Sequence, residues 1–160
     1  MQCIDLIPIE RNPYHCDIDI IFTANDPLAY DNTPTTDSQT ITVNGTQYVV
    51  ANGGNHEAYP TITLTFNDAQ THIYIHNLSV TDNRLDIAKE FEAADILEIN
   101  CKDSIIKLNS SNSPAGLGEG GSALAEMIML TIGDNTLEVG SDDATINVDV
   151  DISFNKPYLY

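Results

Sequence analysis

The sequence predicts an all-β fold, a two-sheet antiparallel β-sandwich with one or two short helices. Many short segments alternate apolar and polar residues with period two, which is typical of strands that bury one face. Clusters of Gly, Pro, Asn and Asp separate these segments at intervals of about eight to twelve residues. The predicted strands are residues 16–22, 41–43, 46–50, 60–66, 71–80, 84–88, 95–101, 104–109, 136–139 and 144–154.

The dipeptide Asn44-Gly45 gives the strongest turn signal. Both central positions of a two-residue type I′ turn need positive φ, which Asn and Gly tolerate. Because apolar residues lie on both sides of the dipeptide, we expect residues 41–43 and 46–50 to pair as a hairpin. Asp82-Asn83 and Lys102-Asp103 predict two further turns between paired strands.

The same alternation predicts the core. Every second residue of 60–66 and of 144–154 is apolar, and Thr, Asp, Asn and Ser occupy most of the positions between. The last segment is therefore expected to be a long strand with one wet face. The residues expected to be buried are Ile62, Leu64, Phe66, Ile146, Val148, Val150 and Ile152.

Two stretches are expected to hold the short helices, residues 86–94 and residues 122–129. In the second, Ser122 is a good N-cap, and apolar residues recur near helical spacing after it. Residues 31–38, DNTPTTDS, have the composition of a linker. We therefore divide the chain into an N-terminal arm with its linker, residues 1–37, and a sandwich domain, residues 38–160.

The N-terminal arm carries an apolar strand, residues 16–22, without obvious partner strands. An unpaired strand is an open edge that tends to recruit another chain. We therefore expect the arm to leave the sandwich and either pair with a neighbouring molecule or be poorly ordered. The alternative is that residues 16–22 add an edge strand to their own sandwich.

The charge excludes several classes of partner. The chain has 24 Asp and Glu against 6 Lys and Arg, a formal net charge of −18. Phosphate backbones and anionic lipid surfaces repel such a protein, so we expect neither nucleic acid nor membrane as a partner. The charge itself is explained by solubility, with a basic partner surface as the alternative.

The cysteines, Cys3, Cys16 and Cys101, are odd in number and widely spaced, and they form no CxxC or CxxH pattern. This argues against a disulfide framework and against structural zinc. The N-terminal residues lack a basic region followed by a long apolar run, so no secretion signal is expected. We expect a protein made in a reducing cytosol.

No segment predicts a catalytic centre. Residues 116–121, GLGEGG, match GxGxxG, but the dinucleotide fingerprint needs a strand directly before it within a βαβ unit, so we expect a flexible loop. The chain has no GxSxG motif and no cysteine at a helix start. The prediction is that catalytic, cofactor-binding and metal-ligating residues are all absent.

His72, Tyr74 and His76 share one face of a predicted strand. The two histidines would lie roughly 13 Å apart, too far to chelate one metal ion. They are expected to be surface residues, and a sugar-binding face that includes Tyr74 is the alternative.

Acidic residues recur in pairs at Asp17 with Asp19, Asp149 with Asp151, and Asp142-Asp143. Glycoside hydrolysis needs two carboxylates across a cleft, whereas the first two pairs each lie on one strand face. They are therefore expected to be solvated, and Asp142-Asp143 is expected to be a turn. A calcium site where acidic loops converge is the alternative, although no EF-hand spacing occurs.

The order of several local motifs carries a further signal. Residues 20–30, IIFTANDPLAY, end in a DPxAY motif, and residues 53–66, GGNHEAYPTITLTF, contain GNxxAxPxI at Gly54, Asn55, Ala58, Pro60 and Ile62. In this order, the motifs resemble those in the C-terminal part of siphophage distal tail proteins. The later similar segments are IYIHNLSV (73–80), DILEINCKDSIIKLN (95–109), Gly133-Asp134-Asn135 after Leu130, and Lys156-Pro157-Tyr158-Leu159.

This resemblance covers roughly residues 15–160 and implies a galectin-like or jelly-roll sandwich without enzymatic activity. Proteins of that family form hexameric rings between the tail tube and the baseplate or fibre. The resemblance thus implies other tail proteins as partners, a homo-oligomer, and a place in the virion tail of a phage or prophage after synthesis in the bacterial host cytoplasm. The chain departs from the family in two respects. Only residues 1–30 stand where the family has a ring-forming domain, and Asn100-Cys101 stands where an Ile-Asp pair is common.

Three classes of function follow, and the tail structural protein is the favoured one. The second is a carbohydrate-binding sandwich module, against which the absence of Trp counts because sugar faces stack on aromatic rings. The third is an unrelated adhesion or scaffold domain.

Overall fold

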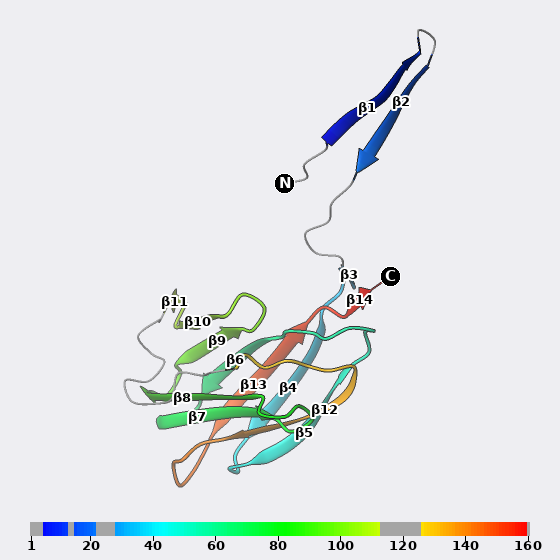
Figure 1. Ribbon diagram of the computed structural model, residues 1–160. Coiled ribbons are helices and arrows are strands. Elements are labelled where there is room, and N and C mark those ends of the chain that lie inside the picture. The colour runs from blue at the N-terminus through cyan, green and yellow to red at the C-terminus, as the bar shows by residue number, and fades with distance from the viewer. Residues whose placement is uncertain (1–4, 13–14, 22–27, 113–125, 160) are drawn as a thin grey trace.

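The computed structural model describes residues 5–12, 15–21, 28–112 and 126–159. One antiparallel sheet has six strands in the order β11-β10-β9-β6-β13-β4, and a second has four in the order β5-β12-β7-β8 (Figure 1). Two small sheets, β1-β2 and β14-β3, complete the described part. The strands are β1 (Asp5–Asn12), β2 (His15–Ile21), β3 (Leu28–Tyr30), β4 (Thr35–Ile41), β5 (Thr46–Asn52), β6 (Thr61–Phe66), β7 (Gln70–Asn77), β8 (Arg84–Phe91), β9 (Ile96–Asn100), β10 (Ile105–Leu108), β11 (Ser111–Asn112), β12 (Gly133–Gly140), β13 (Val148–Phe154) and β14 (Pro157–Leu159).

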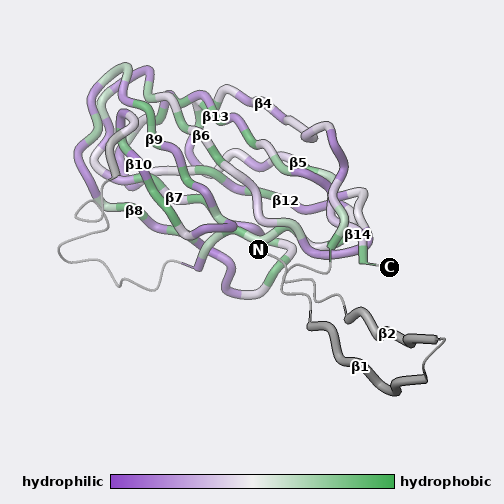
Figure 2. The backbone as a smooth tube through the Cα atoms, turned by 90° about the horizontal axis from the view of Figure 1, so that it is seen from above, coloured by the Kyte–Doolittle hydropathy of each residue, from purple (hydrophilic) through white to green (hydrophobic). Residues whose placement is uncertain are grey.

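The hydrophobic core lies between the two large sheets. Phe66 of β6 and Phe91 of β8 stack across the layers, with ring centroids 4.2 Å apart. Figure 2 shows hydrophobic and hydrophilic residues alternating along the strands of the two large sheets. The β-sandwich prediction is confirmed, and the residues predicted to be buried are all at most 2% exposed: Ile62, Leu64, Phe66, Ile146, Val148, Val150 and Ile152.

The strand β13 lies between β4 and β6 in the six-stranded sheet, and its outer face is wet as predicted. On this face, the Thr40 hydroxyl donates to Asp149 Oδ1 at 2.6 Å, and the Ser38 hydroxyl donates to Asp151. Short hydroxyl side chains thus satisfy the carboxylates of the neighbouring strand.

The hairpin predicted at Asn44-Gly45 is wrong. The turn exists, with Gly45 at φ +70, but β4 pairs with β13 and β5 pairs with β12, so the turn carries the chain from one sheet to the other. Its anchor is the Asn44 side chain, which donates to the carbonyl of Asp143 at 2.7 Å and accepts from the Ser141 amide at 2.9 Å. The turns near Asp82-Asn83 and Lys102-Asp103 do join paired strands, β7-β8 and β9-β10.

The described residues contain no helix, which corrects the expectation for 86–94 and for the described end of 122–129. Residues 84–91 form β8, because Leu85 and Ile87 are buried and alternate with more exposed residues, a period of two. Residues 126–129 have no regular structure, and residues 122–125 lie outside the described part. Nowhere in that part does a helix run far enough, or apolar enough, to cross a bilayer.

Four buried asparagines hold residues 126–132, whose one bridge to another described segment joins Leu130 to Ala58. Their side-chain amides take the place of a neighbouring strand: Asn83 bonds to both Met127 and Met129, and Asn52 donates to the Leu130 carbonyl. An irregular segment can be buried because its backbone polar groups are satisfied in this way. We call these four residues, Asn52, Asn77, Asn83 and Asn135, the amide frame.

The N-terminal strands β1 and β2 pair with each other and with no described strand of the sandwich (Figure 1). The predicted boundary at residue 37 falls inside β4, because residues 35–37 already pair with β13 as part of its ladder. Farther upstream, Leu28–Tyr30 pairs with the C-terminal strand β14.

Candidate functional site

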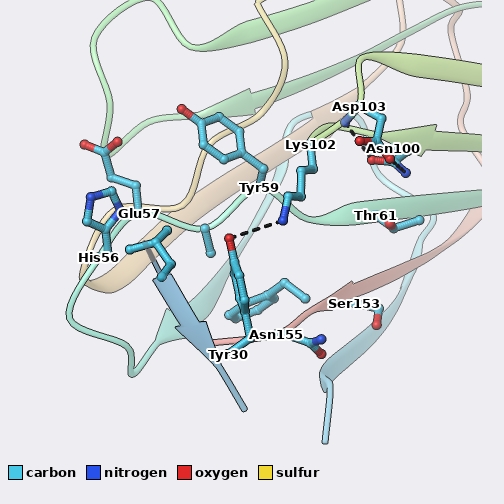
Figure 3. Close-up of a pocket in the computed structure, with 13 residues that line it drawn as sticks. Tyr30, His56, Glu57, Tyr59, Thr61, Asn100, Lys102, Asp103, Ser153 and Asn155 are labelled. Atoms are coloured by element: carbon cyan, nitrogen blue, oxygen red, sulfur yellow. Dashed lines mark hydrogen bonds between the residues drawn. The ribbon is translucent and has the colours of Figure 1, made fainter. Parts of the chain in front are cut away.

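A pocket of about 580 Å³ opens at one end of the six-stranded sheet (Figure 3). Its floor includes Ser153, Thr61 and Asn100, which are register partners on β13, β6 and β9. The walls come from β3, from the segment 56–59 before β6, and from the β9-β10 turn. Segments far apart in the sequence therefore form one concave surface.

Two tyrosines and a lysine stand around this pocket. Tyr59 is 46% exposed and Tyr30 is 37% exposed, high values for large aromatic side chains. The Lys102 Nζ atom lies 4.4 Å from the centre of the Tyr30 ring and 3.2 Å from its hydroxyl (Figure 3). The ring and the hydroxyl together fix the position of the ammonium group.

The β9-β10 turn presents Lys102 in a fixed direction. The Asn100 side chain accepts from the Asp103 amide at 3.0 Å and donates to the Asp103 carboxylate at 2.9 Å. This side-chain bridge closes the turn, and Cys101 points inward at 3% exposure. Burial raises the pKa of the Cys101 thiol to about 12, so this cysteine is an inert part of the core.

The opposite wall begins at His56 and Glu57. Asn52 of the amide frame donates to the His56 carbonyl at 2.9 Å, and Ala58 pairs with Leu130, so the backbone of this wall is fixed on both sides. The His56 Nδ1 atom is buried, and it has no hydrogen-bond partner among the described residues.

The glycine turn Gly53-Gly54-Asn55 clamps the C-terminal strand beside the pocket. The Asn55 side chain donates to the Leu159 carbonyl at 3.0 Å and accepts from its amide at 2.6 Å, as a neighbouring strand would. The Asn55 amide also donates to the Pro157 carbonyl at 3.1 Å. Because β14 pairs with β3, this clamp also fixes the point where the chain enters the sandwich.

A second polar group lies on the outer face of the four-stranded sheet, where the sequence predicted a shared face for His72 and Tyr74. Arg84 donates to both oxygens of Asp86, at 2.7 and 2.8 Å, and its guanidinium lies 4.0 Å from the centre of the Tyr74 ring. Tyr74 donates to Glu138 at 3.2 Å. We call these five residues, His72, Tyr74, Arg84, Asp86 and Glu138, the ionic cluster.

His72 is not the open surface residue that was expected, since its side chain is only 13% exposed. Its Nε2 lies 3.4 Å from Asp86, and its Nδ1 lies 3.4 Å from Asp142 without the alignment of a hydrogen bond. The Arg84 hydrogen bond is the main reason that the pKa of Asp86 is lowered. The cluster is thus one ion pair, Arg84 with Asp86, surrounded by His72 and by the Tyr74–Glu138 hydrogen bond.

The other acidic candidates have structural partners where they are described. Asp143 accepts from the Thr71 amide at 2.6 Å and the Thr71 hydroxyl at 2.7 Å, and these bonds lower its pKa. Asp149 accepts from Thr40, as above. Within the described ranges, no group of three or more His, Cys, Asp and Glu residues could hold a metal ion.

The remaining sequence candidates are not placed. Asp17, Asp19 and Cys16 lie on β2, whose side chains are outside the description, and residues 116–121 and Cys3 are outside it altogether. The residues around the pocket were not predicted as a site.

Comparison with known proteins assigns the fold and the family. The family model of the C-terminal domain of the siphovirus-type tail component matches residues 53–158. The crystal structure of SPP1 Dit (gp 19.1), described as a paradigm of the hub adsorption apparatus in phages that infect Gram-positive bacteria, superposes with a TM-score of 0.66 at 18% identity. The match covers 99% of this chain but 59% of that chain, and no curated protein sequence matches. The chain belongs to the siphovirus-type tail component family, the family of siphophage distal tail proteins.

Proposed function

We propose that this chain is a non-enzymatic structural component of the phage tail tip, which binds other tail proteins: tail tube, tip or fibre. The family supports a tail component, and the SPP1 protein of the same fold is described as part of a hub. The site of action is then the virion tail, after synthesis in the host cytoplasm.

The observation that carries an assembly role is the separate sheet β1-β2. Its two strands pair only with each other among the described residues, so each has an outer edge whose backbone groups lack a described strand partner. Such edges pair readily with strands of another chain. The N-terminal segment through residue 27 is thus proposed as an assembly arm, and the sandwich as the domain that it joins.

Two features favour a non-enzymatic role. In the part of the chain that the structure describes, the buried thiol of Cys101 has a raised pKa, Arg84 is paired with Asp86, and Glu138 accepts a hydrogen bond from Tyr74. The pocket is lined by tyrosine and asparagine side chains together with the charged side chains of Glu57, Lys102 and Asp103, and this lining suits binding more than acid–base chemistry.

The test compares the full chain with a version that starts at Leu28, which keeps β3 and its pairing with β14. Multi-angle light scattering should give a multiple of 17.5 kDa for the full chain and a monomer for the shortened version. Thermal unfolding of the shortened version, followed by circular dichroism, serves as the control that the sandwich still folds. Equal oligomeric states for two folded proteins would contradict the arm's role.

A further inference from the structure

The pocket at the end of the six-stranded sheet has the size of a small-ligand site. Its volume of about 580 Å³ lies within the range of roughly 300–1,000 Å³ found for ligand pockets in proteins. This is room for one or two sugar rings. The pocket lies on the sandwich itself and not on the β1-β2 sheet, so a ligand could bind there independently of assembly through the arm.

The lining of the pocket suits a ligand with many hydroxyl groups. The floor offers the Ser153 and Thr61 side chains, and the walls add Asn155 and Glu57, so donors and acceptors face the same space. The His56 side chain lies in the same lining, and an imidazole can exchange hydrogen bonds with a ligand hydroxyl. An apolar ligand would leave these groups unsatisfied.

The charge of the pocket selects against anions. Among the described lining residues, Lys102 is the basic side chain and Glu57 and Asp103 are the carboxylates, within a chain of net charge −18. Lys102 is already engaged with the ring and hydroxyl of Tyr30. Phosphorylated or uronic acid ligands would therefore be repelled, whereas a neutral ligand would not.

We propose that this pocket binds one or two rings of a neutral saccharide. The Tyr59 ring, 46% exposed at the rim, packs against the apolar face of a sugar ring. Glu57 accepts from sugar hydroxyls, and the Asn155 amide donates to one. This inference goes beyond the assembly role, because either can fail while the other holds.

The experiment uses the full chain and ligand-observed saturation-transfer NMR, which tolerates a large assembly. The probes are glucose, galactose, N-acetylglucosamine, lactose, cellobiose and chitobiose, with glucuronic acid as the anionic comparison. We expect saturable transfer to at least one neutral sugar, with a dissociation constant on the order of 1–10 mM, and none to glucuronic acid. Calorimetry with the best probe then measures the affinity.

Two exposed-residue variants locate the site. Tyr59→Ala should weaken binding about tenfold or more, which corresponds to the roughly 1.4 kcal/mol of one lost ring contact, and Glu57→Gln should weaken it several-fold. The matched control is Tyr74→Ala, an aromatic deletion in the ionic cluster, which should leave the affinity unchanged. Circular dichroism checks that each variant is folded.

Three outcomes would overturn the proposal. The first is the absence of saturable transfer with all six neutral sugars. The second is unchanged binding in folded Tyr59→Ala. If binding were in addition lost in Tyr74→Ala, the site would lie on the four-stranded sheet instead. The third is equal binding of glucuronic acid, which would refute the selection for neutral ligands.

Discussion

The amide frame and the ionic cluster are both polar networks on the four-stranded side of the sandwich. They differ in solvent exposure, and therefore in whether water can replace a lost hydrogen-bond partner. Asn52, Asn77 and Asn135 are 0% exposed, and their partners are mostly backbone groups of an irregular segment. The side chains of Arg84 and Asp86 are 40% and 44% exposed, and water can solvate either of them when the other is lost. The comparison teaches that burial, more than the formal charge of the groups, sets the energetic importance of a network.

The largest expected effect is for Asn135→Ala in the amide frame. Asn135 donates to the carbonyls of Thr131 and Gly133, and it accepts from the Thr131 amide and from Asn77. Removing the side chain leaves several buried groups unpaired, at about 1–3 kcal/mol for each. We expect a loss of about 3 kcal/mol or more in the free energy of unfolding, measured by urea denaturation.

The matched control for that variant is Asn147→Ala, an asparagine whose amide donates to Asp68 at an exposed position. Here water replaces the lost partner, and the loss should stay within about 0.5 kcal/mol. Equal losses for the two variants would break the distinction between buried and exposed amides.

Two glycines sharpen the comparison at an intermediate magnitude. A Cβ on Gly54 would overlap the backbone carbonyl oxygen of Pro157, so β14 must move away from its clamp. A Cβ on Gly140 would overlap the ring of Tyr74, which is the far end of a side chain that can rotate away. We expect Gly54→Ala to cost about 2 kcal/mol, within the usual range for overpacking, and Gly140→Ala about 1 kcal/mol or less.

Thermal unfolding of the two glycine variants measures this order. A larger loss for Gly140→Ala would mean that the Tyr74 ring cannot leave its place. The ionic cluster would then be as rigid as the buried frame.

The sequence was informative where a pattern is local. Period-two alternation predicted the buried faces of β6 and β13 and the sandwich, because a strand's two faces are written in consecutive residues. It could not choose the partner of β4, since Asn44-Gly45 specifies a turn and not the sheet that each flanking strand joins. The partner depends on contacts with residues about a hundred positions away.

The amide frame and the pocket were missed for the same reason. Asn83 and Asn135 lie in segments that have the composition of turns, and nothing local shows that their side chains bond to residues 126–131. Tyr30, Tyr59 and Lys102 meet only because β3, β6 and the β9-β10 turn end at the same edge. The composition, with few aromatic residues and no Trp, counted against a sugar-binding protein, but composition does not show that two of the tyrosines lie at one cavity.

The smallest expected effect is that of Asp86→Asn in the ionic cluster. The pH dependence of this effect shows whether it comes from the pair with Arg84. The Arg84 hydrogen bond lowers the pKa of Asp86 below its unfolded value of about 3.9, so its contribution is present above that pH and is lost as the pH falls through the folded pKa. Because the Asp86 side chain is 44% exposed, we expect Asp86→Asn to lower the free energy of unfolding by under about 1 kcal/mol at pH 7. The difference from wild type should shrink below pH 4. Glu90→Gln, an exposed carboxylate on the same strand without a described ion pair, is the control and should show no such trend. Urea denaturation between pH 3 and 7 measures both variants, and a difference that grows on acidification would refute the role of the Arg84 pair.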